Sequence, residues 1–236
     1  MVCPACQSTY IVKNGSIHNG KPKFLCRDCG RQFVENPCSN KIPQTTKDMI
    51  DKLLLEKISR AGIVRATGVS ARWLQNYVNE KYRSISKTLH VVKKKLPERL
   101  TVECDELWGF VAKKANQQWL WLAKDRSSEP IVGCHVGKRD KEGALGLWNS
   151  LPEIYRNNAV FYTDFWSSSQ EVLPNKRHFA VGKETGQTNH IERFNNTLRQ
   201  RVSCLVRKTL SFAKKLDNFE GAIWDFIHHY NSTLVV

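Results

Sequence analysis

The sequence predicts a mixed α/β protein made of three successive parts. Two Cys-x-x-Cys pairs lie within the first 30 residues, a helical pattern follows from Gln44, and strand and helix patterns alternate after residue 100. The formal net charge is +15, and residues 1–100 carry most of it, with 19 Lys and Arg against 7 Asp and Glu. A basic front part before a nearly balanced one favours a nucleic-acid-binding module joined to a domain with its own acidic groups, over a merely soluble basic protein.

The first part, residues 1–35, is predicted to be a small zinc ribbon. Its two knuckles are separated by a Gly/Asn-rich hairpin, and their four cysteines are Cys3, Cys6, Cys26 and Cys29. A cysteine pair on a tight turn places two thiolates on one face, and two such pairs complete a tetrahedral Zn²⁺ site with no open position. The zinc is therefore expected to be structural, because so short a segment cannot fold on its apolar core alone. Two redox pairs are the alternative, but no βαβ pattern follows either of them.

The second part, residues 44–80, is predicted to be an all-α helix-turn-helix DNA-binding domain. A helix from Gln44 to Ile58 precedes a short helix at 63–67, a turn at Gly68–Ser70 and a second helix from Ala71. Polar side chains on the outer face of this last helix are expected to contact base edges or phosphates: Arg72, Gln75, Asn76 and Asn79. Any amphipathic helix pair shows part of this pattern, so the interpretation also depends on the cysteine knuckles and the positive charge.

Residues 81–99 are predicted to be a linker. The segment lacks clear periodicity and ends in a lysine run, Lys93–Lys95, before Pro97. Such a run is typical of a solvated linker and equally of a segment that touches DNA, so both alternatives stay open.

The third part, residues 100–236, is predicted to form a sheet flanked by helices. Strand patterns occupy 100–111, 117–125, 130–137, 158–163 and 177–181. Helical patterns occupy 141–151, 165–172, 187–206 and 211–232. Three strands in hairpin succession, followed by alternating helices and strands, give a mixed sheet, and this is the ribonuclease-H-like order.

Three acidic residues of this third part are the candidate catalytic groups. Asp105 lies in the first strand, Asp164 closes the fourth, and Glu192 lies on a later helix. Carboxylates that converge from such elements can hold paired Mg²⁺ or Mn²⁺ ions, which prefer oxygen ligands and promote phosphodiester chemistry. By strand alternation Glu103 shares a face with Asp105 and competes with it as a ligand, whereas Glu106 points to the other face.

Other roles stay open for these acidic residues. Asp164 is also placed to cap a following helix, and Arg199 is placed to pair with Glu192 instead of a metal. Asp125, at the end of a predicted strand, is expected to cap a turn.

Six short motifs run through the third part of the chain. They are Asp105-Glu-Leu-Trp108, Gln118-Trp-Leu-Trp-Leu-Ala-Lys-Asp-Arg126, Tyr162-Thr-Asp-Phe-Trp166, His178 with Gly182-Lys183, Thr188-Asn-His-Ile-Glu-Arg193, and Arg207-Lys-Thr209. This series resembles the DDE transposases of the insertion-sequence-one family, which also carry a four-cysteine zinc finger and a helix-turn-helix in front. The resemblance implies a catalytic triad of Asp105, Asp164 and Glu192. The interval from Asp164 to Glu192 looks a few residues longer than in the family, with Lys183–Gly186 the place for the extra residues.

The resemblance implies a polynucleotidyl transferase that binds the ends of an insertion element, cleaves there and joins the 3′-hydroxyl to target DNA. Structural Zn²⁺ and catalytic Mg²⁺ or Mn²⁺ are the expected cofactors. Double-stranded DNA is the expected partner, with a homodimer or higher oligomer assembled on it. Basic residues late in the chain suit contacts to the DNA end: Arg193, Arg199, Arg207 and Lys208. The alternatives are a non-catalytic DNA-binding regulator and a metal-dependent nuclease without strand transfer.

The sequence also predicts where the protein resides. It contains no 18-residue apolar run, and Cys3 leaves no room before it for a signal peptide, so a cytoplasmic, nucleoid-associated protein without membrane contact is expected. The cysteines outside the knuckles are expected to be small buried hydrophobic residues: Cys38, Cys104, Cys134 and Cys204.

Overall fold

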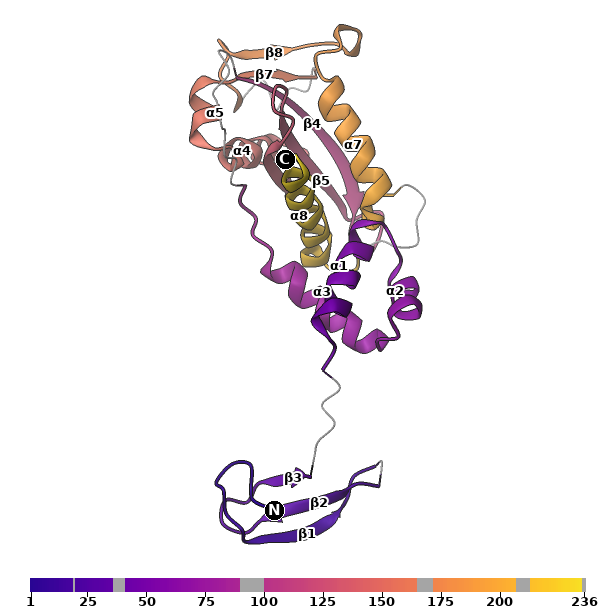
Figure 1. Cartoon of the computed structure of the whole chain (residues 1–236). Helices are drawn as coiled ribbons and strands as arrows, with labels where there is room; N and C mark the ends of the chain where they lie inside the picture. The colour runs from indigo at the N-terminus through magenta and orange to yellow at the C-terminus, as the bar shows by residue number, and fades with distance from the viewer. Residues whose placement is uncertain (19, 36–40, 90–99, 165–171, 207–212, 235–236) are drawn as a thin grey trace. The chain divides into compact units, whose positions relative to one another are not determined.

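The computed structural model describes residues 1–18, 20–35, 41–89, 100–164, 172–206 and 213–234 (Figure 1). The chain divides into two compact units, Met1–Pro43 and Gln44–Val236. Some residues discussed above lie outside the described residues: Cys38, Lys93–Lys95, Pro97, Phe165, Trp166 and Arg207–Thr209.

The first unit is built on a three-stranded antiparallel sheet. Its strands, in the order β1-β2-β3, are β1 (Ile11–Ser16), β2 (Pro22–Cys26) and β3 (Gln32–Val34). Among the described residues of this unit, the buried hydrophobic side chains are Cys3, Phe24 and Cys26, and the Phe24 ring lies 6.0 Å from that of Phe33. A core this small cannot stabilise the unit by apolar burial alone.

The second unit begins with a helical segment, residues 44–89. It contains α1 (Gln44–Leu55), α2 (Arg60–Thr67) and α3 (Ala71–Ser84). The Ser59 hydroxyl accepts the Gly62 N–H at 3.1 Å, so α2 begins three residues earlier than the sequence pattern predicted. The predicted first helix was three residues too long, because Lys57 has a left-handed φ of 63°.

A five-stranded mixed sheet forms the centre of the second unit. The strands are β4 (Thr101–Phe110), β5 (Gln117–Asp125), β6 (Ile131–Gly137), β7 (Val160–Thr163) and β8 (His178–Ala180). Their order is β6-β5-β4-β7-β8; β4 pairs antiparallel with β5 and parallel with β7. The predicted mixed α/β class is confirmed, and each predicted strand lies within three residues of its observed bounds.

Helices cover both faces of this sheet (Figure 1). They are α4 (Lys141–Ser150), α5 (Glu153–Asn158), α7 (Asn189–Arg201) and α8 (Leu216–Thr233), with 3₁₀ turns η1 (Lys183–Thr185) and η2 (Ser203–Leu205). Side chains of α7 and α8, such as Ile191 and Ile223, share a core with Leu107 and Leu120 of the sheet. On the opposite face, α4 and α5 pack on Cys104 and its neighbours. Cys104, Cys134 and Cys204 are buried, as predicted.

Two helix predictions need correction, and one observed helix was not predicted. The predicted helix 187–206 ends at Arg201, because Val202 has extended backbone and enters the core. The predicted helix 211–232 begins only at Leu216. Helix α5 was not predicted, because six residues after Pro152 are too few to show a helical period. The predicted helix 165–172 lies outside the described residues except for Val172.

Helix α3 packs directly on α8, so the helical segment is part of the second unit. A Cβ atom added at Gly221 would lie 2.3 Å from the Cβ of Tyr82, and only glycine permits this approach. The Lys81 ammonium lies between Asp225 of α8 at 3.2 Å and Asp51 of α1 at 3.3 Å. The residues predicted to start a linker at 81 therefore continue α3 to Ser84 and contribute to this contact.

None of the helices in the described ranges combines the length and the apolar character needed to span a bilayer.

Candidate active site

The two predicted catalytic aspartates lie side by side, Asp105 in β4 and Asp164 directly after the neighbouring strand β7. The parallel pairing of β4 with β7 aligns Glu103 with Tyr162. Asp105 and Asp164 each lie two residues further on, so alternation directs both side chains to the face covered by α7. Oxygen atoms of Asp105, Glu106 and Asp164 all lie within 4.8 Å of one another.

The third predicted acid lines the same cleft. We call this cleft, of about 240 Å³, the acidic cleft; its lining residues are Cys104, Asp105, Glu106, Leu107, Asp164, Thr188, Glu192, Asn195, Asn196 and Arg199. Glu192 lies in the first turn of α7, and its Oε1 accepts a hydrogen bond from the Thr188 hydroxyl at 3.1 Å. Glu192 is not part of the tightest group of oxygen atoms, which consists of Asp105, Glu106 and Asp164.

Asp105 is half-buried in the cleft and accepts a hydrogen bond at each carboxylate oxygen. Its Oδ2 accepts from Asn195 Nδ2 at 2.7 Å, and its Oδ1 accepts from the Glu106 N–H at 2.8 Å. Burial raises the pKa of Asp105 to about 7, and the negative charges of Glu106 and Asp164 act in the same direction. Crowded carboxylates of this kind are stabilised in their ionised form by a nearby cation.

The donor atoms of the acidic cleft fit a hard divalent cation. Mg²⁺ and Mn²⁺ take oxygen ligands, and the cleft supplies carboxylate oxygens from three acids within 4.8 Å. Asn195 adds a further oxygen, since its Oδ1 is buried and has no hydrogen-bond partner among the described residues. A buried polar atom without a partner is costly, so a bound cation or its water would complete this site.

Glu106 is the residue of this site that sequence reasoning missed. Strand alternation placed it on the opposite face, yet its carboxylate joins the oxygens of Asp105 and Asp164. The register of β4 with β7 runs from Thr101 to Glu103, so Glu106 lies beyond the paired residues of β4. Its Oε1 also accepts from Arg139 Nε at 2.8 Å, and burial raises the pKa of Glu106 against the opposing effect of that arginine.

Glu103, which the sequence offered as an alternative metal ligand to Asp105, lies outside the acidic cleft. It is fully buried and does not line the acidic cleft. Its Oε2 accepts the N–H groups of His190 at 2.9 Å and Ile191 at 3.0 Å, and its Oε1 lies 2.8 Å from His190 Nδ1 and 3.3 Å from Arg126 Nε. Glu103 therefore binds the N-terminal turn of α7, the helix that carries Glu192.

Asp125 caps a turn, as predicted. Its Oδ1 accepts the Ser127 N–H at 2.9 Å, and its Oδ2 accepts the Tyr155 hydroxyl at 2.7 Å. The residue is fully buried at the end of β5 and is not among the lining residues of the acidic cleft.

The basic residues predicted to contact DNA lie in different surroundings. Arg193 is exposed on α7. Arg199 lines the acidic cleft, where its guanidinium donates to the Leu205 carbonyl at 3.4 Å. Arg207 and Lys208 lie outside the described residues.

On α3, the four predicted DNA contacts divide into two pairs. Arg72 and Asn76 are exposed, whereas Gln75 and Asn79 are half-buried. The Gln75 amide donates to Asn79 Oδ1 at 2.7 Å, and Asn218 of α8 donates to the same oxygen at 2.9 Å.

The four cysteines of the first unit are close enough to share one ion. The Cys3 and Cys29 sulfurs lie 3.6 Å apart, as do those of Cys6 and Cys26, and all four lie within 4.8 Å of one another. A zinc tetrahedron with Zn–S bonds of about 2.3 Å has sulfur–sulfur edges of about 3.8 Å. The arrangement thus fits a four-thiolate zinc site.

Comparison with known proteins identifies the family. The sequence model described as IS1 transposase matches residues 99–231. The insertion element iso-IS1n protein InsB of Shigella dysenteriae is 34% identical over 133 residues, which is 56% of this chain and 96% of that protein. The insertion element IS1 4 protein InsB of Escherichia coli (strain K12) is 35% identical over 130 residues, 54% of this chain and 75% of that protein.

A solved structure was also found, from the simian T-cell lymphotropic virus intasome in complex with PP2A regulatory subunit B56 gamma. It is 16% identical, covers 60% of this chain and 55% of that chain, and has a TM-score of 0.33. The family match and the InsB relatives together cover the whole sheet and the acidic cleft. The chain belongs to the IS1 transposase family.

Proposed function

We propose that this chain is a DDE transposase that cleaves DNA at the ends of its insertion element and joins the 3′-hydroxyl to target DNA. The single observation that carries this proposal is the acidic cleft, where Asp105 and Asp164 of adjacent strands lie with Glu192 of α7. The sheet, with its order β6-β5-β4-β7-β8 and its flanking helices, supports a ribonuclease-H-like assignment for the domain.

In this proposal Asp105, Asp164 and Glu192 hold divalent cations through carboxylate oxygens. When bound, a pair of such ions would supply activation of the attacking oxygen and stabilisation of the leaving oxygen of a phosphodiester. Asn195 orients Asp105 by its hydrogen bond of 2.7 Å, and Thr188 orients Glu192. Glu106 lies at the same group of oxygens but is paired with Arg139, so we assign it a supporting role.

Strand cleavage and joining are expected to use this one cleft without a covalent protein–DNA intermediate. The cleft brings four carboxylates together with two amides, and this donor set suits activation of water or of a 3′-hydroxyl with bound divalent cations. Incubation of the protein and Mg²⁺ with a duplex that ends in the element's own terminal sequence tests this. A nick that leaves a 3′-hydroxyl at the element end is the expected result, and an intact duplex would refute the proposal.

The first unit is proposed to be a zinc ribbon that supports DNA binding, and we expect it to bind one Zn²⁺ through Cys3, Cys6, Cys26 and Cys29. Loss of one thiolate leaves an incomplete tetrahedron, so Cys26→Ser is expected to lose the metal. Metal analysis of purified wild-type and variant protein measures this. Cys134→Ser is the matched control, since Cys134 is buried in the sheet domain. Equal zinc in wild type and Cys26→Ser would contradict the assignment.

The helical segment is proposed to bind the element ends as a helix-turn-helix, with α3 as the recognition helix. Arg72 is exposed near the start of α3, where such helices contact bases. Arg72→Ala is expected to weaken binding to element ends by about 1–3 kcal/mol if the arginine contacts a base. Arg83→Ala, exposed in the last turn of the same helix, is the control. A salt-controlled titration in which both variants bind like the wild type would disprove the role of Arg72.

A further inference from the structure

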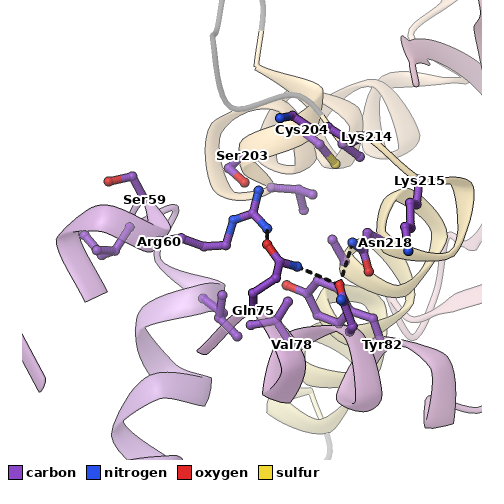
Figure 2. A pocket seen from close by; sticks show the side chains of 16 residues that line it. Ser59, Arg60, Gln75, Val78, Tyr82, Ser203, Cys204, Lys214, Lys215 and Asn218 are labelled. Atoms are coloured by element: carbon purple, nitrogen blue, oxygen red, sulfur yellow. Dashed lines mark hydrogen bonds between the residues drawn. The ribbon is translucent and has the colours of Figure 1, made fainter. Parts of the chain in front are cut away.

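The second unit contains another hollow, and no Asp or Glu is among the residues that line it. We call it the basic cavity. It has a volume of about 460 Å³ and lies between α3 and the segment that leads into α8 (Figure 2). Its walls come from the end of α1, the start of α2, the inner face of α3, η2 and the first turns of α8.

The charge of this cavity is one-sided. Its lining includes three cationic residues, Arg60, Lys214 and Lys215, and no Asp or Glu. In the described part of the chain, none of the three forms a salt bridge, although Arg60 donates a hydrogen bond to Gln75 (Figure 2). Uncompensated cations around a hollow create a positive potential that attracts an anion.

Neutral hydrogen-bonding groups lie beside these cations. Gln75 of α3 lines the cavity beside Arg60 (Figure 2). Asn79 lines it as well, and its Oδ1 accepts a hydrogen bond from Asn218 of α8 at 2.9 Å. Helix α8 begins at this point, and its N-cap, Lys215, makes no side-chain cap hydrogen bond. The first N–H groups of a helix favour negative charge, but Asp217 already supplies one in the first turn of α8, so the attraction to an anion comes from Arg60, Lys214 and Lys215.

We propose that the basic cavity binds the phosphodiester backbone of the DNA that α3 engages. Lys214 and Lys215 would neutralise phosphates, and Asn218 would donate a hydrogen bond to the strand. A continuous strand fits better than a free nucleotide, because the cavity shares α3 with exposed Arg72 and Asn76. This inference rests on the proposed function, since it assigns a further contact to the same DNA.

The position of the cavity gives this contact a consequence for catalysis. Its wall includes Ser203 and Cys204 of η2, and η2 follows α7 directly. Leu205 of η2 accepts a hydrogen bond from Arg199, which lines the acidic cleft. DNA held in the cavity would therefore be fixed by the helical segment and the catalytic domain together, in a set relation to the cleft.

The test compares two variants that each lose two positive charges. Lys214→Gln/Lys215→Gln alters the cavity, and Lys113→Gln/Lys114→Gln alters an exposed lysine pair between β4 and β5. Affinity for a short duplex is measured across a range of salt concentrations. The cavity variant is expected to lower the slope of log K against log salt by about 1 per lysine, while the control keeps the wild-type slope. Equal slopes for the two variants would overturn the inference.

Cross-linking provides an independent measurement of the same contact. Lys214→Cys and Lys113→Cys are each mixed with duplex DNA whose tether on a backbone phosphate ends in a mixed disulfide, so that the protein thiolate displaces the small thiol and forms the cross-link. A disulfide yield several-fold higher for Lys214→Cys than for Lys113→Cys and for wild type supports the site. Equal yields would exclude it even if the protein binds DNA normally. Failure of the wild-type protein to bind any duplex would instead refute the proposed function, and the cavity assignment with it.

Discussion

Replacement of Asp105, Asp164 or Glu192 by its amide is expected to abolish end cleavage and strand joining while binding to element ends stays nearly unchanged. The amide keeps the shape of the side chain but removes a charged oxygen ligand. Loss of an outer-shell partner of a metal ligand already costs about 10–100-fold, so loss of the ligand itself should cost more than about 100-fold. Gel assays of cleavage, joining and binding measure the three effects separately.

Two further variants make this result specific. Glu153→Gln, exposed on α5, is the matched control and should retain wild-type joining. Glu106→Gln tests which residue is the third acid. Glu106, and not Glu192, has a carboxylate oxygen within 4.8 Å of oxygens of both aspartates in the group described above. If Glu106→Gln is inactive and Glu192→Gln is active, Glu106 instead of Glu192 is the third metal-binding carboxylate. Joining by all the amide variants would contradict a metal-ion mechanism altogether.

Glu103→Gln is expected to destabilise the protein and to reduce joining, although Glu103 does not line the acidic cleft. The carboxylate is fully buried and binds two backbone N–H groups of α7 together with His190 and Arg126. Removal of one charged partner from a buried pair costs about 3–5 kcal/mol. Chemical denaturation measures the loss of stability. A joining assay below the unfolding temperature measures the loss of activity that follows when α7 no longer holds Glu192 in place.

Glu142→Gln is the control for this effect. Glu142 lies exposed in the first turn of α4, where a carboxylate contributes only about 0.3–1 kcal/mol through the helix dipole. If Glu103→Gln unfolds at the same denaturant concentration as Glu142→Gln, the positioning role of Glu103 is wrong. A stable but inactive Glu103→Gln would point instead to a direct role in the chemistry.

Long regular patterns made the strands predictable from the sequence. Strand β5 was predicted at its observed bounds, since the apolar run Trp119–Ala123 is flanked by polar residues that lead into turns. The parallel pairing of β4 with β7 follows from a chain that leaves the sheet through helices and returns, and it brings Asp105 beside Asp164. The proximity of Asp105 and Asp164 could therefore be predicted from the order of the strands.

Other features depended on packing that no local pattern encodes. Glu106 joins the acid group from a position of β4 beyond its pairing with β7, although strand alternation assigns its side chain to the other face. The contact of α3 with α8 depends on Gly221, a single residue that reads as a weak helix former in the sequence. For the same reason, the half-burial of Gln75 and Asn79 could not be predicted from the outer face of an isolated helix.

The most direct test of the central claim is a strand-transfer assay. Wild-type protein is incubated with Mg²⁺, a labelled duplex that carries a pre-nicked element end, and a plasmid target. The label is expected to become covalently joined to the plasmid through the 3′-hydroxyl, and Asp164→Asn is expected to give no joined product. Nicking of the plasmid without any joined label would contradict this expectation, because the acidic cleft would then belong to a nuclease.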